Sequence, residues 1–387
     1  MSHPDSSKKV LLLVNADRTD QDRHRPMGKR GPRRRTDFDA LAEALNADVL
    51  DWSAVRSSRL GRSLEGLTNW YVAAAVLAFL RHRRYRLIWC MTEQEGTLLA
   101  LLLKLTRRRT PLMTVVVVPT SWSMWVMLRL FRAHSHITQM FSTSSFPLDT
   151  LRSSWGVPAD KVSLLPYQVD IDFFNEKWAE VEPGDTPYII GVGQQARDFN
   201  TLIDAVRDLP VNLVIAADSL WARRRREPWR AGLPDNVSVT TLDYPALRDL
   251  YAGCAFVVVP LFETDVQHGI TSIQEGMSMG KAVVVTRTRG QGDLVADDQV
   301  VTRDGSGRST MGYFPRYFRP DAEELHGPTG IYVPPGDVDA MRGAVQRLLG
   351  DPKLAAELGD RGRAVCEGVV SLDHFVERVL EAAKPYL

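Results

Sequence analysis

The chain has 387 residues, 44% of them apolar and 25% charged, and its formal net charge is only +1. This composition is typical of a soluble globular protein, and the length is too great for one ordinary core, so we expect two domains. The charge is unevenly shared, because Lys and Arg outnumber Asp and Glu by 25 to 14 in residues 1–168 and are outnumbered by 33 to 23 in the remainder. That asymmetry bears on binding partners rather than on the fold.

Strands and helices alternate through the first half of the chain. This rhythm predicts a parallel sheet whose strands are joined by crossover helices. The expected elements are strand Val10–Val14, helix Thr36–Leu45, helix Trp70–Leu80, strand Leu87–Met91, helix Thr97–Leu105, strand Met113–Val118, helix Trp122–Arg132 and strand His136–Ser142.

The same pattern starts again after a short strand and turn within Asp160–Asp170. We therefore expect two α/β domains, residues 1–168 and 169–370, with a C-terminal helix at about 371–387 that packs back on the first. The expected elements of the second half are strand Tyr188–Val192, helix Phe199–Val206, strand Asn212–Ala216, strand Val237–Leu242, helix Pro245–Gly253 and strand Phe256–Phe262.

The segment Gln267–Thr286 is the most informative part of the sequence. Directly after strand Phe256–Phe262, it reads as a short helix entered at Gly269, a glycine stop and a buried strand. The start of such a helix offers unpaired N–H groups and the positive end of its dipole, where a phosphate or diphosphate binds. Thr271 and Glu275 share one helix face, which places Glu275 to hydrogen-bond a ribose diol beside that anion. A surface carboxylate is the plainer alternative, but the apolar neighbours of Glu275 favour a buried, partnered group.

The short apolar runs and the few cysteines of the sequence indicate the cellular compartment in which we expect the protein. Cys90, Cys254 and Cys366 are far apart and mostly within apolar stretches, which indicates buried thiols rather than disulfides or a metal site. The N-terminal residues Met1–Lys9 are polar, and the longest apolar stretch, Trp70–Leu80, is too short to span a bilayer. We expect a cytoplasmic protein, with peripheral attachment to the inner membrane face left open.

Six segments follow one another in residues 160–380: Val162–Asp170, Gly191–Gly193, Arg197–Ala205, Gln267–Thr286, Thr329–Asp337 and Leu358–Arg363. Their order resembles the C-terminal domain of retaining GT-B glycosyltransferases, the group 1 or sucrose-synthase-like superfamily with an E-x7-E motif. Residues 1–160 match that family only in their strand–helix rhythm. The resemblance implies an α/β GT-B fold, in which two Rossmann-like domains face a cleft.

The resemblance also implies roles for individual residues. Arg197 would offset the charge on the leaving diphosphate without any metal, and no cofactor is expected besides the donor substrate, a UDP-, GDP- or dTDP-sugar. Glu275 would bind the ribose, Gln267 the sugar, and the main chain near Tyr244 the base. The remaining donor-binding residues would be Gly193, Gln194, His268, Gly269, Ile270 and Thr271.

Two positions depart from the family pattern. Gln267 stands at the first acidic position of E-x7-E, and Gln194 stands where an arginine usually follows the second loop glycine. We interpret both as altered sugar recognition in a retaining, metal-independent hexosyltransferase. The alternative is a non-catalytic GT-B protein that binds nucleotide sugar. For His268 and Arg197, ordinary loop and helix-entry roles are the alternatives.

Candidate acceptor-side residues lie in the first half. Glu93 and Glu95 follow a strand end, where ligands gather in α/β sheets, although a solvated loop pair is the favoured interpretation. The run Arg18–Arg35 holds eight Lys and Arg and is either an anion-contacting loop or a disordered one.

One apolar helix face and the basic residues near it bear on which acceptor the protein uses. Trp122, Trp125, Leu128 and Phe131 fall on a single helix face. We favour a core role for this stripe, and docking of it with nearby basic clusters on an anionic membrane is the alternative. A basic half suits a lipid-linked, polysaccharide or other anionic hydroxyl acceptor, with a natural product close behind. Nucleic acid is not expected as a partner, because no RNA-reading signature is present.

Overall fold

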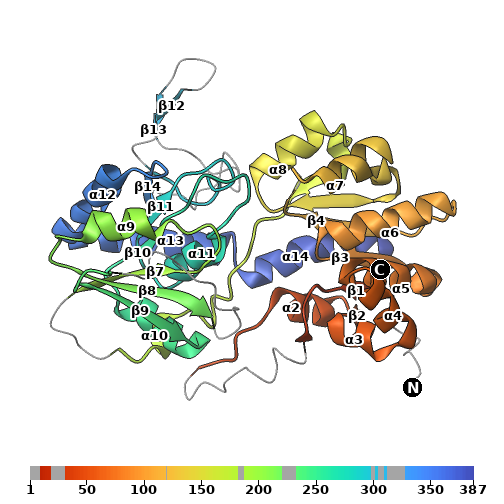
Figure 1. Ribbon diagram of the computed structural model, residues 1–387, viewed down its shortest axis with the longest axis horizontal. Helices are drawn as coiled ribbons and strands as arrows, with labels where there is room; N and C mark the ends of the chain where they lie inside the picture. Colours follow the sequence, from red (N-terminus) through yellow and green to blue (C-terminus); the bar gives the residue numbers. More distant parts are fainter. Residues whose placement is uncertain are drawn as a thin grey trace. The chain divides into compact units, whose positions relative to one another are not determined.

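The computed structural model describes residues 9–18, 31–118, 120–181, 187–219, 232–297, 301–303, 309–311 and 327–387. They belong to two units, the first made of Met1–Arg25, Arg35–Pro166 and Leu372–Leu387 and the second of Pro26–Arg34 and Tyr167–Ser371. Each unit holds a six-stranded parallel sheet. Helices cover both faces of each sheet (Figure 1). The α/β class and the presence of two Rossmann-like units are therefore confirmed.

The sheet of unit 1 has the strand order β2-β1-β3-β4-β5-β6. Its strands are β1 (Val10–Leu13), β2 (Asp48–Leu50), β3 (Leu87–Cys90), β4 (Leu112–Val116), β5 (Gln139–Ser142) and β6 (Val162–Leu164). The helices of this unit are α2 (Asp37–Ala44), α3 (Trp52–Ser57), α4 (Arg59–Leu67), α5 (Trp70–Arg81), α6 (Glu93–Leu105), α7 (Trp122–Trp125), α8 (Ser145–Asp149) and α14 (Leu372–Ala383).

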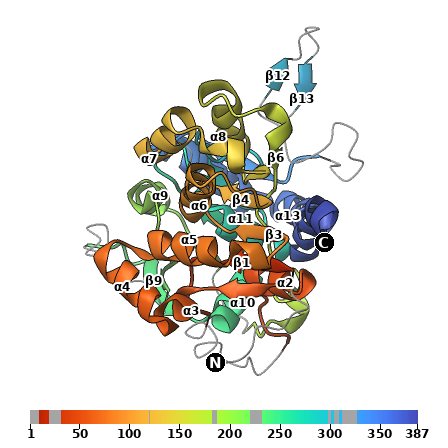
Figure 2. The same ribbon diagram turned by 90° about the vertical axis from the view of Figure 1, so that its right-hand side faces the viewer.

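Alternation along β1 divides the core of unit 1 into two layers. Leu11 and Leu13 pack toward α5 and α6, whereas Val10 and Leu12 pack toward α2 and α14. Successive side chains of a strand point to opposite faces, so a fully apolar strand needs cover on both. Helices α5 and α6 lie side by side on one face (Figure 2), and α14 packs against α2 on the other.

The sheet of unit 2 has the order β14-β11-β10-β7-β8-β9, so strand order reverses between β7 and β10. Its strands are β7 (Tyr188–Val192), β8 (Asn212–Ser219), β9 (Val237–Leu242), β10 (Val257–Val259), β11 (Val283–Thr286) and β14 (Gly330–Val333), and β12 (Val301–Arg303) and β13 (Ser309–Met311) form a separate antiparallel pair. Helices α9 (Phe199–Val206), α10 (Tyr244–Gly253), α11 (Ile270–Ser278), α12 (Val338–Gly350) and α13 (Pro352–Gly368) cover it.

Two sequence expectations need correction. Helix α6 begins at Glu93, four residues before the predicted start, because Thr92 and Glu95 form a capping box. The stripe beginning at Trp122 is not core, since only Leu128 is buried in it and Trp122 is 78% exposed.

All three cysteines are buried, as predicted. No helix within the described ranges combines the length and apolarity needed to cross a membrane.

Candidate functional site

The reversal of strand order in unit 2 brings two loops together. One loop leaves β7 and carries Gly193–Arg197, and the other leaves β10 and leads to Gly269 at the start of α11. A backbone bridge between Arg197 and Leu261 ties the two loops to each other. In open α/β sheets, ligands bind outside the carboxyl ends of strands at such a reversal. The fold thus places the predicted site residues of the second half where this topology holds ligands.

Arg197 is a buried cation fixed by the loops around it. Its Nε donates to the carbonyl of Val192 at 2.8 Å, one Nη donates to the carbonyl of Gln195 at 2.8 Å, and the other donates to Ser272 Oγ at 3.2 Å. Burial lowers the pKa of Arg197 to about 10, while the nearby Tyr251 and Glu275 act in the opposite direction. The guanidinium therefore remains charged at neutral pH in a poorly hydrated place, where it has a strong effect on a neighbouring anion.

Two glycines lie directly against this guanidinium. Gly193 has φ +97°, and a Cβ at that position would be 2.4 Å from Nη2 of Arg197. Gly269 has φ +82°, and its Cβ would be 2.7 Å from Val259 Cγ1 and 3.5 Å from Nη1 of Arg197. Both positions demand glycine because of the left-handed backbone and because no side chain fits. Main chain can consequently approach a ligand closely beside Arg197.

Helix α11 begins at this point without a side-chain cap. Gly269 is its N-cap residue and provides no side-chain hydrogen bond. Within the described part of the chain, no acceptor is present for the amides of Gly269, Ile270 and Thr271. First-turn amides and the helix dipole together favour an anion. The geometry thus combines an uncapped helix start with a buried cation.

Glu275 lies one turn further along α11 and is buried. Its Oε2 accepts a hydrogen bond of 3.0 Å from the hydroxyl of Tyr251 on α10, and among the described residues Oε1 has no hydrogen-bond partner. Burial raises the pKa of Glu275 to about 7, although Arg34, Tyr251 and Arg197 each lower it. One carboxylate oxygen is therefore available to a ligand.

The other predicted donor-site residues surround this cluster. Gln267 is buried, and Gln194 is half-buried at the loop leaving β7. His268 is half-buried, and its pKa is lowered by burial and by Arg197, so its ring is neutral at neutral pH. Thr271 is exposed at the mouth of the site. Tyr244 begins α10, and the guanidinium of Arg34 stacks over its ring at 4.3 Å.

Three participants were not singled out from the sequence. Tyr251 and Ser272 are buried polar partners of Glu275 and Arg197, and neither carries a sequence signal, because their contacts cross 24 and 75 positions. Arg34 belongs to unit 2 and lies near Tyr244 and Glu275. Arg34 was one of eight cations in the run Arg18–Arg35, of which residues 19–30 lie outside the described part.

The structure separates Glu93 and Glu95 from solvent. Both are buried in the first turn of α6, so the solvated-loop interpretation is wrong. Glu93 accepts from the amide of Val117 at 3.1 Å, and Glu95 accepts from the amide and hydroxyl of Thr92. Burial raises the pKa of both carboxyl groups, that of Glu95 to about 8. Their bonds serve the local backbone, and an acceptor-side role for them stays a prediction.

Among the residues that the structure describes, no group of three His, Cys, Asp or Glu side chains lies close enough to hold a metal ion. The cluster in unit 2 is instead built on a buried cation, one carboxyl group, two glycines and uncapped amides. That set can bind a phosphate-containing ligand and hydroxyl groups beside it.

Part of this chain matches a known protein family. Residues 171–308 match the family described as Glycosyl transferases group 1, and this supports the predicted superfamily. No curated protein sequence matches the chain.

The fold is shared with solved structures at low sequence identity. A Rickettsia africae glycosyltransferase is 14% identical with a TM-score of 0.66, and the match covers 98% of this chain and 99% of that one. Sucrose-phosphate synthase from Thermosynechococcus elongatus is 18% identical with a TM-score of 0.66 and 98% coverage of both chains. Anabaena HepE, solved with UDP and glucose, is 17% identical with a TM-score of 0.62, covering 97% of this chain and 99% of that one.

Proposed function

We propose that this protein is a glycosyltransferase whose donor site is the cluster around Arg197 in unit 2. The observation that carries the proposal is the position of Arg197, a buried cation between Gly193 and Gly269 at the uncapped start of α11. The group 1 family match and the UDP-bound Anabaena neighbour support a nucleotide sugar as the ligand.

In the proposed complex, the diphosphate of a UDP-, GDP- or dTDP-sugar contacts the amides of Gly269, Ile270 and Thr271. Arg197 offsets the charge that grows on the departing diphosphate, so that no metal is needed, and this stabilisation is the main contribution of the protein to the rate. His268 contributes a neutral ring beside the phosphates. The open oxygen of Glu275 accepts from the ribose hydroxyls.

The sugar and the stereochemistry complete the proposal. Gln267 and Gln194 hydrogen-bond the hexose without adding charge, and the main chain at Tyr244 meets the base. The nucleotide leaves from the face that the acceptor hydroxyl attacks, so the anomeric configuration of the sugar is retained. Leaving-group oxygens assist deprotonation of that hydroxyl.

The proposal is tested by ligand screening followed by turnover. Thermal unfolding of the purified protein is measured with a panel of nucleotide sugars, because a ligand that binds only the folded state raises the melting temperature. The stabilising compound is then incubated with the protein, and release of free nucleoside diphosphate is followed. We expect one base and hexose to stabilise the protein and to release diphosphate. A panel without any stabilising member would contradict the donor site.

The second candidate function is nucleotide-sugar binding without turnover. The presence of Gln267 and Gln194, which lack the charge expected at both positions, favours it. Stabilisation by a nucleotide sugar without any release of diphosphate would support this candidate. In that case Gln267→Glu is informative, because new activity would identify the natural protein as a binder, whereas changed sugar preference would identify Gln267 as a specificity residue.

The acceptor in this proposal is a hydroxyl compound at an anionic membrane, in glycolipid or polysaccharide synthesis. Trp122, Trp125 and Phe131 are exposed on unit 1, beside the exposed cations Arg129 and Arg132. Aromatic side chains with neighbouring basic groups are typical of interfacial membrane contacts.

Co-sedimentation with anionic vesicles tests the membrane contact. Trp122→Ser combined with Trp125→Ser should reduce the bound fraction. Leu67→Ser is the matched control, since Leu67 is 83% exposed on α4. Equal loss in both proteins would count against the contact.

A further inference from the structure

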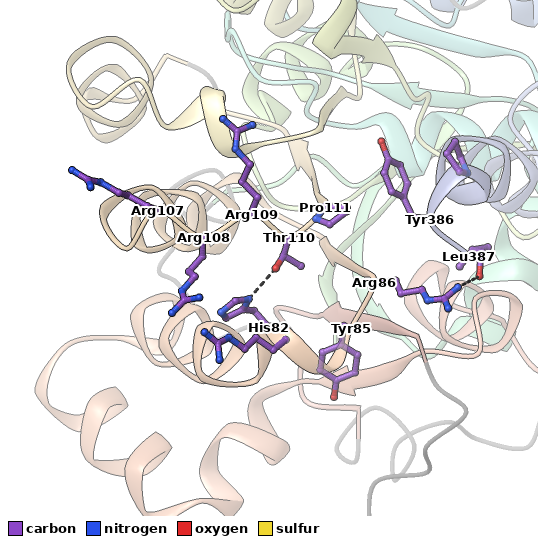
Figure 3. Close-up of a pocket in the computed structure, with 12 residues that line it drawn as sticks. His82, Tyr85, Arg86, Arg107, Arg108, Arg109, Thr110, Pro111, Tyr386 and Leu387 are labelled. Carbon is purple, nitrogen blue, oxygen red and sulfur yellow. Dashed lines mark hydrogen bonds between the residues drawn. The ribbon is translucent and has the colours of Figure 1, made fainter.

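Unit 1 contains a cavity at the edge of its sheet where β3 and β4 begin. The cavity has a volume of about 640 Å³ and is lined by residues that precede these strands, including Arg86 and Pro111 (Figure 3). Glu93 and Val117 follow the same strands at the opposite edge. The cavity is therefore distinct from the carboxyl-end edge of its own sheet, where ligands of α/β folds usually bind. It also shares no residue with the donor site proposed in unit 2.

Arginines dominate the walls of this cavity. Arg83, Arg86, Arg108 and Arg109 line it, with Arg107 at its rim, and all five are exposed. Within the described ranges none of them forms a salt bridge. Tyr85 in the lining donates to the carboxylate of Asp48 at 2.9 Å, and Arg86 donates to the main-chain oxygen of Leu387 at 3.2 Å (Figure 3). The other four arginines have neither a hydrogen-bond acceptor nor an acidic partner among the described residues, so the wall carries a large positive charge.

The loops that carry these arginines are held in defined positions. Nδ1 of the buried His82 and Oγ1 of Thr110 are 2.9 Å apart, and this bond joins the segment after α5 to the segment after α6 (Figure 3). Burial, followed by Arg83 and Arg108, lowers the pKa of His82, so the ring is neutral at neutral pH. Arg107 adopts φ +54°, a left-handed conformation that favours glycine. A strained backbone turn thus presents Arg108 and Arg109.

Stabilisation of helix dipoles does not account for this arrangement. Cations near the last turns of α5 and α6 are favourable, but that effect is confined to the final turn and is satisfied by one or two charges. Here Arg83, Arg86, Arg108 and Arg109 come from two segments and line one cavity, so that like charges gather around it and repel each other. A bound anion would remove that repulsion.

We propose that this cavity, the arginine pocket, binds a ligand with two or more phosphate groups. Guanidinium groups match phosphate oxygens with paired hydrogen bonds, and several arginines can share the oxygens of a polyphosphate. The volume lies in the range of small-molecule sites, so a diphosphate with an attached group fits. The same chemistry is offered by a soluble polyphosphate compound and by a phosphorylated lipid headgroup.

Inorganic tripolyphosphate is the probe for the first experiment. Binding is measured by calorimetry for the full chain and for the double variant Arg108→Gln with Arg109→Gln. The control is Arg59→Gln with Arg62→Gln on α4, which removes the same charge from the same unit. We expect saturable binding that is weakened at least about tenfold in the arginine-pocket variant and is unchanged in the control. Absence of saturable binding, or equal weakening in both variants, would overturn the proposal.

A second experiment distinguishes the two sources of phosphate. Vesicles of phosphatidylcholine with a minor share of cardiolipin, whose headgroup carries two phosphates, are incubated with the protein, and tripolyphosphate is added as a competitor. Displacement of the wild-type protein but not of the arginine-pocket variant assigns a lipid headgroup to the pocket. Calorimetric binding without such displacement assigns a soluble polyphosphate. A UDP-sugar should raise the melting temperature of the arginine-pocket variant as much as that of the wild-type protein. A wrong assignment of the arginine pocket can therefore be told apart from a wrong assignment of the donor site.

Discussion

Each unit contains a buried glutamate on the helix that follows a strand at its reversal of strand order, yet the two glutamates differ in their partners. Glu95 lies in the first turn of α6 after β3, and Thr92 occupies both of its carboxylate oxygens. Glu275 lies in the second turn of α11 after β10, and Tyr251 occupies one oxygen only. Burial raises the pKa in both cases, to about 8 and about 7, so the pKa does not tell them apart.

The starts of the two helices differ in the same way. Helix α6 begins with a capping box that satisfies the amides of Thr92 and Glu95, whereas α11 begins at Gly269 without a side-chain cap. A buried carboxyl group is therefore structural where its own helix uses it, and available to a ligand where hydrogen-bonding capacity remains. Of these two helices, α11 is therefore the one whose buried carboxyl group and first amides keep hydrogen-bonding capacity.

The largest effect is expected from Arg197→Lys, which keeps the charge but loses the fixed fork of donors. If Arg197 stabilises the departing diphosphate, turnover should fall by about 10² to 10³-fold. Arg363→Lys is the control, because Arg363 also donates to a main-chain carbonyl, that of Ser278 at the other end of α11. Steady-state release of nucleoside diphosphate is the measurement. Equal turnover of the two variants would remove Arg197 from the mechanism.

The next effect concerns stability as a function of pH. Because the pKa of Glu275 is raised from 4.5 to about 7 in the folded protein, the native state binds more protons between these values and loses stability as pH rises through them. Glu275→Gln removes this loss, worth up to about 3 kcal/mol. Urea unfolding at about pH 5 and about pH 8 should show the variant gaining on wild type at the higher pH. Parallel curves would mean that Glu275 is ionised throughout.

A smaller effect is expected from Tyr251→Phe, which removes the hydroxyl that holds Glu275. Donor affinity should fall by about tenfold, because a misplaced carboxyl group bonds the ribose poorly. Tyr188→Phe is the matched control, since the hydroxyl of Tyr188 donates to Leu250 rather than to the cluster. Calorimetric titration with the nucleotide sugar compares the two. A greater loss in the Tyr188 variant would show that the hydroxyl of Tyr251 is not specific.

The smallest effect on function is expected at Glu95. Glu95→Ala removes the capping box and should cost about 1 kcal/mol of stability, while donor affinity stays unchanged. Chemical unfolding and the same titration measure both quantities. A variant with normal stability and impaired donor binding would reverse the assignment of the two glutamates.

Much of the fold was predictable because its strands are apolar and its helices periodic. The predicted bounds of Tyr188–Val192, Phe199–Val206 and Val237–Leu242 agree with β7, α9 and β9. The start of α6 was missed although Thr92 and Glu95 have the spacing of a capping box. Trp122 was expected in the core because it shares a helix face with other apolar residues, and this expectation was wrong. Periodicity shows which residues share a face, but it does not show what covers that face.

The site was predictable only where sequence motifs carry it. Arg197, Gly193 and Gly269 were expected together, and the fold places them in contact. Tyr251 could not be expected, because its bond to Glu275 depends on how α10 and α11 pack. The ligand roles of all these residues stay predictions.

The most direct test is a crystal structure of the protein grown with UDP or GDP. We predict that the two phosphates lie within about 3 Å of the amides of Gly269 and Ile270, with the guanidinium of Arg197 beside them. A nucleotide bound away from the start of α11 would contradict the account.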